Sequence, residues 1–374
     1  MAGIYLHIPF CRKACHYCNF HFSTLLKNKN AMVDAILKEI SREAYKLKGQ
    51  PVETIYFGGG TPSLLTEEEL DHLMEMLFRS FDVSAGAEIT FEVNPDDITR
   101  ESLAAWKKSG INRLSIGVQS FRDEDLAWMN RAHNSGEALN GIQLARDAGF
   151  NNLTIDLIYG TPGLSDKAWE ENVQKAISLG VPHLSCYALT VEPKTRLEKM
   201  IRTHQAADTD PEQQSRQFLL LMDWLRAAGY EHYEISNFAR PGFRSRHNSA
   251  YWQGVPYLGF GPGAHSYNGK TRSWNLANNA LFMQGIEKDI PVSEEEVLTT
   301  SNRINEYIMT SLRTAEGMDM RKISDEYGDE YAKAVGDRIG KYQSSGQLIQ
   351  ENGVIRLTNE GKLFADGIAA DLFC

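Results

Sequence analysis

The chain has 374 residues, 42% of them hydrophobic, which is enough for two domains or for one large barrel with an appended domain. Its formal net charge is −10 and no block of Lys and Arg stands out, so a nucleic-acid-binding surface is not expected. The sequence has no apolar stretch of membrane-spanning length and begins without the basic and apolar regions of a secretory signal. We therefore expect a cytoplasmic protein without a membrane span.

Short apolar runs and amphipathic stretches alternate from residue 3 to about residue 228. Strands are expected at residues 3–9, 52–57, 88–93, 113–118, 153–159 and 183–189, and helices at about 30–48, 66–80, 99–109, 135–148, 165–179 and 211–228. Four of the helices are followed by the glycine expected just beyond a helix C-terminus, at Gly110, Gly149, Gly180 and Gly229. Successive strand–helix units with short connections predict a parallel sheet.

The positions of polar residues distinguish between two parallel folds. The cysteines after the first strand, Gly58–Thr61, Glu92, Gln119 and Asp156 all lie at or near the carboxyl ends of successive strands. A doubly wound sheet concentrates its ligand at one switch point, whereas a barrel builds one site from many strand ends. The sequence therefore predicts an α/β protein with a partial (β/α)6 barrel.

The strand–helix rhythm ends near residue 235. We expect a barrel domain over residues 1–235, an irregular bridge over residues 236–292 and a small C-terminal domain over residues 293–374. Ser293-Glu-Glu-Glu is expected to open a helix. Leu348–Leu357 is expected to form a hairpin that turns at Asn352-Gly353. Helices followed by a hairpin suggest a winged-helix-like domain.

Three of the five cysteines form a C-x3-C-x2-C run at Cys11, Cys15 and Cys18. Thiolates at this spacing suit an iron–sulfur cluster, and three ligands for four irons leave one iron open. An odd number of cysteines argues against a disulfide framework. Zinc is the main alternative, because a histidine of this region would complete a closed site, and the candidates are His7, His16 and His21.

Several strand-end residues have the chemistry of a ligand site. Gly58-Gly-Gly-Thr-Pro62 allows a ligand to approach the backbone closely, although alone it is equally typical of a tight turn. Glu92, Gln119 and Asp156 interrupt apolar strands, and burying such groups without partners costs several kcal/mol. They are either satisfied within the core or share a ligand, to which Arg131 would offer a bidentate carboxylate clamp.

Together these motifs resemble the radical S-adenosylmethionine superfamily. The segments Tyr5–Cys11, Gly59–Pro62, Gly117–Gln119, Ile155–Gly160 and Gly259–Ala264 are similar to one branch of it, which contains the oxygen-independent coproporphyrinogen III oxidases and their heme chaperone relatives. The resemblance extends over essentially the whole chain and implies the radical S-adenosylmethionine type of barrel.

The resemblance also implies cofactors and roles. Cys11, Cys15 and Cys18 would hold a 4Fe–4S cluster whose open iron binds the amino and carboxylate groups of S-adenosylmethionine. Gly59, Gly60 and Thr61 would contact that amino group, and Arg131 the carboxylate. Glu92, Gln119 and Asp156 would surround the ribose and sulfonium. The remaining nucleoside-pocket positions implied by the resemblance are Tyr5, Tyr17, Ala188 and His265.

Two features separate the members of this branch. The oxidases carry another cysteine two residues after the triad, where this chain has Phe20, and they have an N-terminal extension that is not found here. The segment His247-Asn-Ser-Ala-Tyr251-Trp252 matches a motif associated with the chaperones. His247 would ligate heme iron while Tyr251 and Trp252 stack on the porphyrin, unless it is a structural histidine beside core aromatics.

The expected function is therefore binding of heme and its transfer to acceptor hemoproteins that are respiratory and membrane-bound. Two alternatives stay open: a radical enzyme that acts on a porphyrin, such as an oxygen-independent coproporphyrinogen III oxidase, and a zinc-bound scaffold without radical chemistry. Cys186, within a strand, is expected to be a small buried hydrophobe, and Cys374 to be incidental.

Overall fold

The computed structural model describes all residues, 1–374, and is built around a twelve-stranded sheet with the order β12-β11-β10-β9-β1-β2-β3-β4-β5-β6-β8-β7. Strands β1 to β6 are neighbours in chain order and all pair in parallel. Their bounds are β1 Ala2–Ile8, β2 Val52–Gly59, β3 Val83–Val93, β4 Arg113–Gln119, β5 Leu153–Tyr159 and β6 His183–Ala188. The partial (β/α)6 barrel is thereby confirmed.

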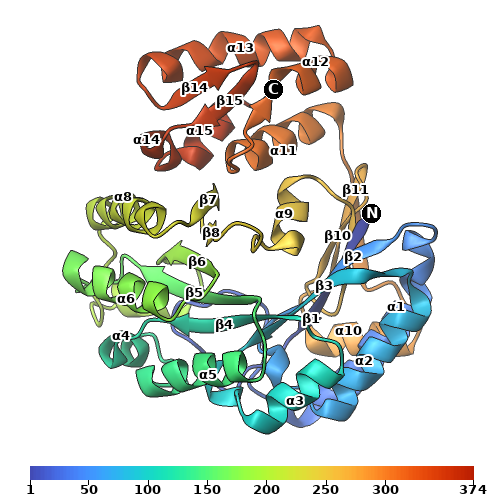
Figure 1. Ribbon diagram of the computed structural model, residues 1–374. Coiled ribbons are helices and arrows are strands. Elements are labelled where there is room, and N and C mark those ends of the chain that lie inside the picture. Colours follow the sequence, from blue (N-terminus) through green and yellow to red (C-terminus); the bar gives the residue numbers. More distant parts are fainter.

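Helices follow each of these strands and cover the outside of the sheet (Figure 1). Helix α2 begins as expected, with a capping box between Thr66 and Glu69. Gly110, Gly149, Gly180 and Gly229 have the positive φ angles that helix-terminating glycines adopt. The helices are α1 Lys29–Glu43, α2 Glu67–Ser80, α3 Arg100–Lys108, α4 Asp123–Trp128, α5 Ser135–Asp147, α6 Asp166–Ser178, α7 Arg196–Arg202 and α8 Pro211–Ala227. Short 3-10 helices lie at η1 Leu26–Asn28, η2 Ala44–Leu47, η3 Pro62–Leu64 and η4 Pro95–Asp97.

The barrel strands alternate between two kinds of side chain. Residues that face the helices are apolar and belong to one large buried cluster, for example Ile55 and Phe57 on β2. Residues that face the concave side are polar, for example Thr154 and Asp156 on β5. This period of two follows from strand geometry, and it gives the barrel a polar interior beneath an apolar outer layer.

The expected irregular bridge at residues 236–292 is wrong, because most of this segment is regular and extends both ends of the sheet. β8 (Asn237–Ala239) pairs antiparallel with β6 and β7 (Glu231–Glu234), and β9 (Tyr257–Phe260) pairs parallel with β1. Pairing with a preformed sheet edge stabilises strands too short to be recognised from local pattern. The segment also contains α9 Arg246–Trp252, β10 His265–Tyr267, β11 Thr271–Asn275 and α10 Asn279–Glu287.

The expected helix start at Ser293 is also wrong. Residues Ser293–Val297 form edge strand β12, antiparallel to β11, and helix α11 begins at Thr300 after an N-cap at Thr299. Glutamates suit the first turn of a helix, but they equally suit a solvated edge strand, where charge prevents pairing with another chain. Glu296 lies opposite Arg272 on β11, so cross-strand pairing favours the strand.

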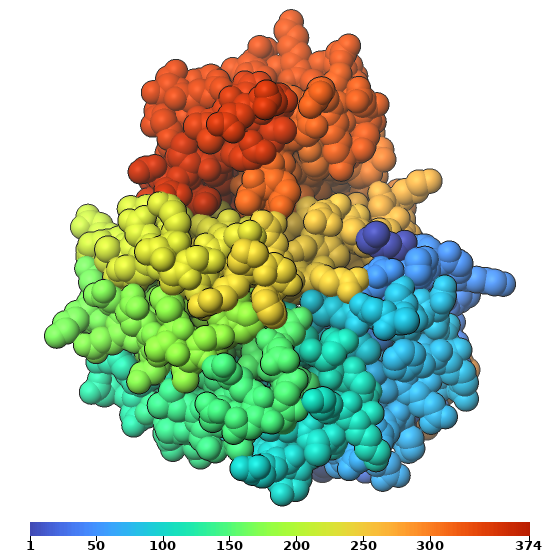
Figure 2. Space-filling model, viewed as in Figure 1, coloured from blue at the N-terminus to red at the C-terminus, as the bar shows by residue number.

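The C-terminal region packs around a hydrophobic core of its own, separate from that of the barrel. The predicted hairpin is confirmed, and helices precede it as expected for a winged-helix-like domain. Figure 2 shows this region, in orange and red, resting on the yellow segment of the chain. The remaining elements are α11 Thr300–Leu312, β13 Met318–Asp319, α12 Met320–Tyr327, α13 Asp329–Ser344, β14 Leu348–Glu351, β15 Val354–Leu357, α14 Asn359–Lys362 and α15 Ala365–Asp371. No helix combines the length and apolar character that crossing a membrane requires.

Candidate functional site

The three cysteines lie in the loop that follows β1, and each side chain is half-buried. Neighbouring elements hold the loop in place: the backbone N–H of His16 donates to the carbonyl of Met129 at 3.1 Å, and that of Cys11 donates to Ser23 at 3.1 Å. Two sulfur atoms accept hydrogen bonds, Cys11 Sγ from Thr61 Oγ1 at 3.5 Å and Cys15 Sγ from Arg131 Nη1 at 3.2 Å. Such donors stabilise thiolate ligands.

The geometry of this loop disfavours the zinc alternative. A single zinc ion needs its donor atoms within about 2.0–2.3 Å of one point, and no group of three His, Cys, Asp or Glu side chains converges in this way. Of the histidines proposed as a fourth ligand, His7 uses both ring nitrogens, on Tyr5 and on the carbonyl of His21. His16 and His21 each use one ring nitrogen, on the carbonyl of Trp128 and on Asn279, and keep the other free. In a 4Fe–4S cluster each thiolate binds a different iron, so convergence on one point is not required.

A cavity of about 500 Å³ opens beside the cysteines on the concave side of the barrel. It brings together residues that lie far apart in sequence and at the ends of different strands. All the cofactor-site residues expected from the sequence line it except Tyr5 and His265: Cys11, Cys15, Cys18, Tyr17, Gly59, Gly60, Thr61, Glu92, Gln119, Arg131, Asp156 and Ala188. The size is typical of a small-molecule site.

Charged side chains gather in this cavity, among them two carboxylates and the guanidinium of Arg131. Burial raises the pKa of Glu92 to about 7, with a further contribution from the nearby charge of Asp156. Burial also raises the pKa of Asp156 to about 6. Arg131 donates to Asn94 at 2.7 Å and to the carbonyl of Gly117 at 2.8 Å, while its buried Nε has no partner. The cavity thus offers acceptors for a cationic group and a guanidinium for an anionic one.

The backbone around the cavity adopts conformations that allow neighbouring segments to lie very close to one another. Gln119, the last residue of β4, has a φ of 67°, a conformation that is uncommon outside glycine and is often found at functional sites. A side chain at Gly60 would place its Cβ 2.6 Å from the carbonyl oxygen of Phe10, so only glycine fits there. Both features hold the strand ends and the cysteine loop close together.

Several residues of this cavity were not predicted from the sequence. Tyr56 donates its hydroxyl proton to Glu92 at 2.6 Å, and Asn94 donates to Thr61 at 3.3 Å. Arg113, buried at the start of β4, lies 3.7 Å from Glu88. The signal that could have found Tyr56 and Arg113 is the alternation of polar and apolar residues along each strand, which marks the face that lines the interior.

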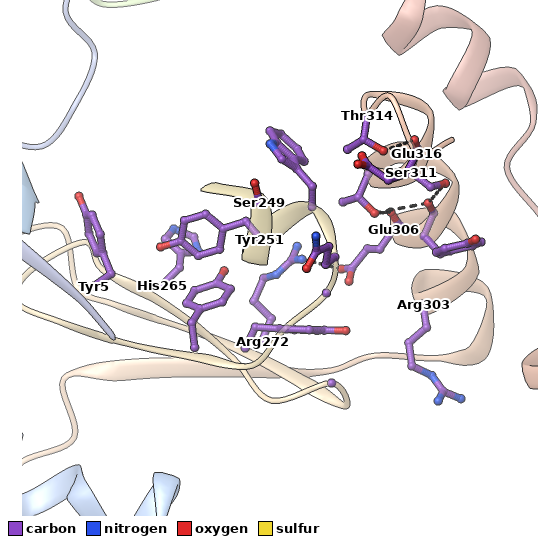
Figure 3. Close-up of a pocket in the computed structure, with 18 of the residues that line it drawn as sticks. Tyr5, Ser249, Tyr251, His265, Arg272, Arg303, Glu306, Ser311, Thr314 and Glu316 are labelled. Atoms are coloured by element: carbon purple, nitrogen blue, oxygen red, sulfur yellow. Dashed lines mark hydrogen bonds and ion pairs between the residues drawn. The ribbon is translucent and has the colours of Figure 1, made fainter. Parts of the chain in front are cut away.

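The two exceptions, Tyr5 and His265, line a second and larger cavity of about 1250 Å³ between the barrel and the C-terminal region (Figure 3). The expected placement of Tyr5 and His265 in the nucleoside pocket is therefore not supported. Tyr251 and Trp252 also line this second cavity. Asn19 and Phe20 of the cysteine loop line both cavities, so the two sites share a wall.

His247 does not stand free in the second cavity as an iron ligand would. Its side chain is 2% exposed, and both ring nitrogens are hydrogen-bonded, Nδ1 with Thr54 at 2.8 Å and Nε2 with the Tyr251 hydroxyl at 2.9 Å. Burial lowers its pKa to about 3, so the ring is neutral. With both ring nitrogens bonded, His247 has none free for an iron, which favours the structural histidine over the expected heme ligand.

Comparison with known proteins places this geometry in a family. The sequence model of the Radical SAM superfamily matches residues 5–176, and that of the HemN C-terminal domain matches residues 298–364. A heme chaperone HemW of Bacillus subtilis is 35% identical over 98% of this chain and 98% of its own length. A heme chaperone HemW of Mycobacterium tuberculosis is 35% identical over 99% of this chain and 94% of its own. The chain belongs to the HemW family.

A solved structure supports the same architecture. Coproporphyrinogen III oxidase (HemN) of Escherichia coli, a radical SAM enzyme, superimposes with a TM-score of 0.86 at 25% identity, over 100% of this chain and 90% of the oxidase chain. The HemW family is thus built on the radical SAM fold, with the strand ends and the cysteine loop at a common edge.

Proposed function

We propose that the chain is a heme chaperone that holds a 4Fe–4S cluster and S-adenosylmethionine and passes heme to acceptor hemoproteins. The observation that carries the proposal is the similarity to curated heme chaperones over nearly the full length of both chains. The large cavity beside the cofactor cavity provides the space that a second, bulky ligand needs.

The residues of the smaller cavity fit the proposed cofactors. Cys11, Cys15 and Cys18 hold the cluster, and a donor already reaches the sulfur of Cys11 and that of Cys15. Arg131 lines the cavity, and its guanidinium would bind the carboxylate of S-adenosylmethionine. Gly59, Gly60 and Thr61 line the cavity and would contact its amino group. The remaining cofactor residues, around the ribose, base and sulfonium, are Tyr17, Glu92, Gln119, Asp156 and Ala188.

The chemistry that a reduced cluster and S-adenosylmethionine supply together is one-electron cleavage of a carbon–sulfur bond. The chain's own contribution is to orient and to exclude water. Tyr56 orients the Glu92 carboxylate, and Asn94 connects Thr61 to Arg131. Held in this way, the side chains need no rearrangement when the cofactor binds.

The acceptors that we propose are respiratory, membrane-bound hemoproteins, and the compartment is the cytoplasm. All five cysteines are free of disulfide bonds, which suits a reducing compartment. An enclosed carrier keeps heme, an apolar molecule with two carboxylates, away from water until it meets an acceptor.

A radical enzyme acting on a porphyrin is the second candidate, favoured by the close superposition on coproporphyrinogen III oxidase. Against it stands Phe20, which occupies the position where, by the resemblance described above, the oxidases carry a further cysteine. Its side chain is 67% exposed and lines both cavities, so it replaces a thiol with an apolar surface at their common wall.

Anaerobically reconstituted protein distinguishes these functions. We expect about four irons and four sulfides per chain and stoichiometric binding of hemin, followed as a change in its absorption spectrum. Coproporphyrinogen III added with S-adenosylmethionine and a reductant should not be decarboxylated. Efficient decarboxylation would establish the enzyme, and purified protein containing zinc in place of iron would establish the scaffold.

A further inference from the structure

The larger cavity is assembled from both parts of the molecule. One side is formed by the cysteine loop, β1 and the segment from α9 to β11, and the other by helices α11 and α12 of the C-terminal domain. Figure 3 shows His265, Tyr5 and Tyr251 on the first side and Glu306 on α11 on the second. At about 1250 Å³ the cavity exceeds the usual range of about 300–1,000 Å³ for small-molecule sites and accommodates a macrocycle.

Three histidines line this cavity, and their ring nitrogens differ in availability. His7 uses both, with Tyr5 at 3.2 Å and with the carbonyl of His21 at 2.8 Å. His21 uses Nε2 on Asn279 at 2.6 Å. His265 makes no side-chain hydrogen bond and is exposed to the cavity, with Trp274 beside it at a ring-centroid distance of 6.2 Å.

We propose that this cavity is the heme site and that His265 is the protein ligand of the heme iron. The proposal rests on the function proposed above and replaces His247 as the ligand. A neutral imidazole with an unengaged nitrogen is what heme iron requires. Burial and the charge of Arg272 both lower the pKa of His265, which favours this neutral form.

The opposite side of the cavity suits the propionates of heme. Arg303 on α11 lines the cavity and forms no ion pair, and Lys322 on α12 lies 4.6 Å from the ring centroid of Tyr307 with only a 4.0 Å contact to Glu326. Arg272, by contrast, is already paired with Glu306 at 2.8 Å. Arg303 and Lys322 are therefore the cations available to carboxylates.

Heme held in this way bridges the barrel, through His265 on β10, and the C-terminal domain, through α11 and α12. The tyrosines on the barrel side provide aromatic faces for the porphyrin: Tyr5, Tyr251 and Tyr257, of which the last two pack edge to face at 4.5 Å. Release of heme would then require only that the two sides separate.

Titration of the cluster-loaded protein with hemin and, in parallel, with iron-free protoporphyrin IX tests the ligand. His265→Ala should remove the absorption and paramagnetic resonance signature of histidine-ligated heme and weaken hemin affinity by about tenfold or more. Protoporphyrin IX, which has no iron, should bind the variant as it binds the wild type. His265→Met should give a different ligation spectrum, because a thioether replaces the imidazole. His72→Ala, which removes an exposed histidine on α2, is the matched control.

Each result has one meaning. A wild-type spectrum in His265→Ala overturns the assignment of the ligand while the proposed function stands. Equal loss of hemin and protoporphyrin IX binding also overturns it, because His265 would then only shape the cavity. Failure of the wild-type protein to bind hemin overturns the proposed function itself.

Discussion

Glu92 and Asp156 are the residues whose charge state determines which ligand the cofactor cavity accepts. Both carboxylates face the cavity, and burial raises their pKa values to about 7 and about 6. When ionised they attract a sulfonium or ammonium group, and when protonated they do not. S-adenosylmethionine carries both of these cationic groups, so its affinity should depend on pH.

We expect the affinity of the cluster-loaded protein for S-adenosylmethionine to rise between about pH 6 and about pH 8, as measured by equilibrium dialysis. The sign follows from the raised pKa values, because the binding-competent ionised forms become populated only as pH rises through them. Glu92→Gln should lower the affinity at pH 8 by about tenfold and flatten the upper part of the profile. Glu101→Gln, at an exposed position on α3, is the control. An affinity that does not change with pH would contradict this account of the cavity.

At this scale the sequence predicted the strand-end residues well and the rest of the cavity poorly. Glu92, Gln119 and Asp156 stand out because each interrupts an apolar run. Tyr56 and Arg113 do not, since a tyrosine or an arginine in a strand is equally common on a surface. Only the folded structure shows that both side chains point from their strands into the same interior.

Helix α9 carries the motif of residues 247–252, and its histidine has a structural role there. Its first two backbone N–H groups, of Arg246 and His247, donate to one oxygen of Glu88 at 3.0 and 3.1 Å. The His247 ring then links Thr54 on β2 to Tyr251 on the next turn of the helix. A buried ring that bonds at both nitrogens fixes how the helix docks on the barrel.

His247→Ala should therefore lower the free energy of unfolding of the metal-free protein by about 2–4 kcal/mol, because it leaves a hydroxyl on each side of the lost ring without a partner and opens a space. Chemical denaturation followed by circular dichroism measures the change. Gln253→Ala, at an exposed position just beyond α9, should leave the stability within about 0.5 kcal/mol. Unchanged stability of His247→Ala, with loss of hemin binding alone, would restore His247 as a ligand.

The elements beyond residue 235 were harder to predict than the barrel for a physical reason. The barrel helices carry local signals, such as the capping box at Thr66 and the glycine at Gly110. Strands β9 and β12 are only four and five residues long, and their pairing partners, β1 and β11, come from the fold as a whole. Local pattern alone does not specify such pairings.

On the scale of the whole molecule, two cavities of different chemistry meet at the cysteine loop. The smaller lies within the barrel and is lined by the three cysteines and by the carboxylates of Glu92 and Asp156, and the larger is lined by many aromatic residues and lies under the C-terminal domain. Asn19 and Phe20, next to the last cysteine in the triad, contribute to both cavities.

The domain boundaries at residues 235 and 292 remain a prediction. The C-terminal domain closes the larger cavity by packing against distant parts of the chain. No motif in the sequence predicts this packing.

The central claim, that the chain carries heme to other proteins, is tested most directly by transfer itself. Heme-loaded protein with its cluster and S-adenosylmethionine is mixed with a heme-free respiratory cytochrome in lipid vesicles, and recovery of the cytochrome spectrum is followed against the same amount of free hemin. We predict that the cytochrome fills faster from the heme-loaded protein than from free hemin. When a membrane permeable only to small molecules separates the heme-loaded protein from the cytochrome, we predict that filling is no longer faster than from free hemin. Filling no faster than from free hemin, or filling across that membrane at an undiminished rate, would contradict the account.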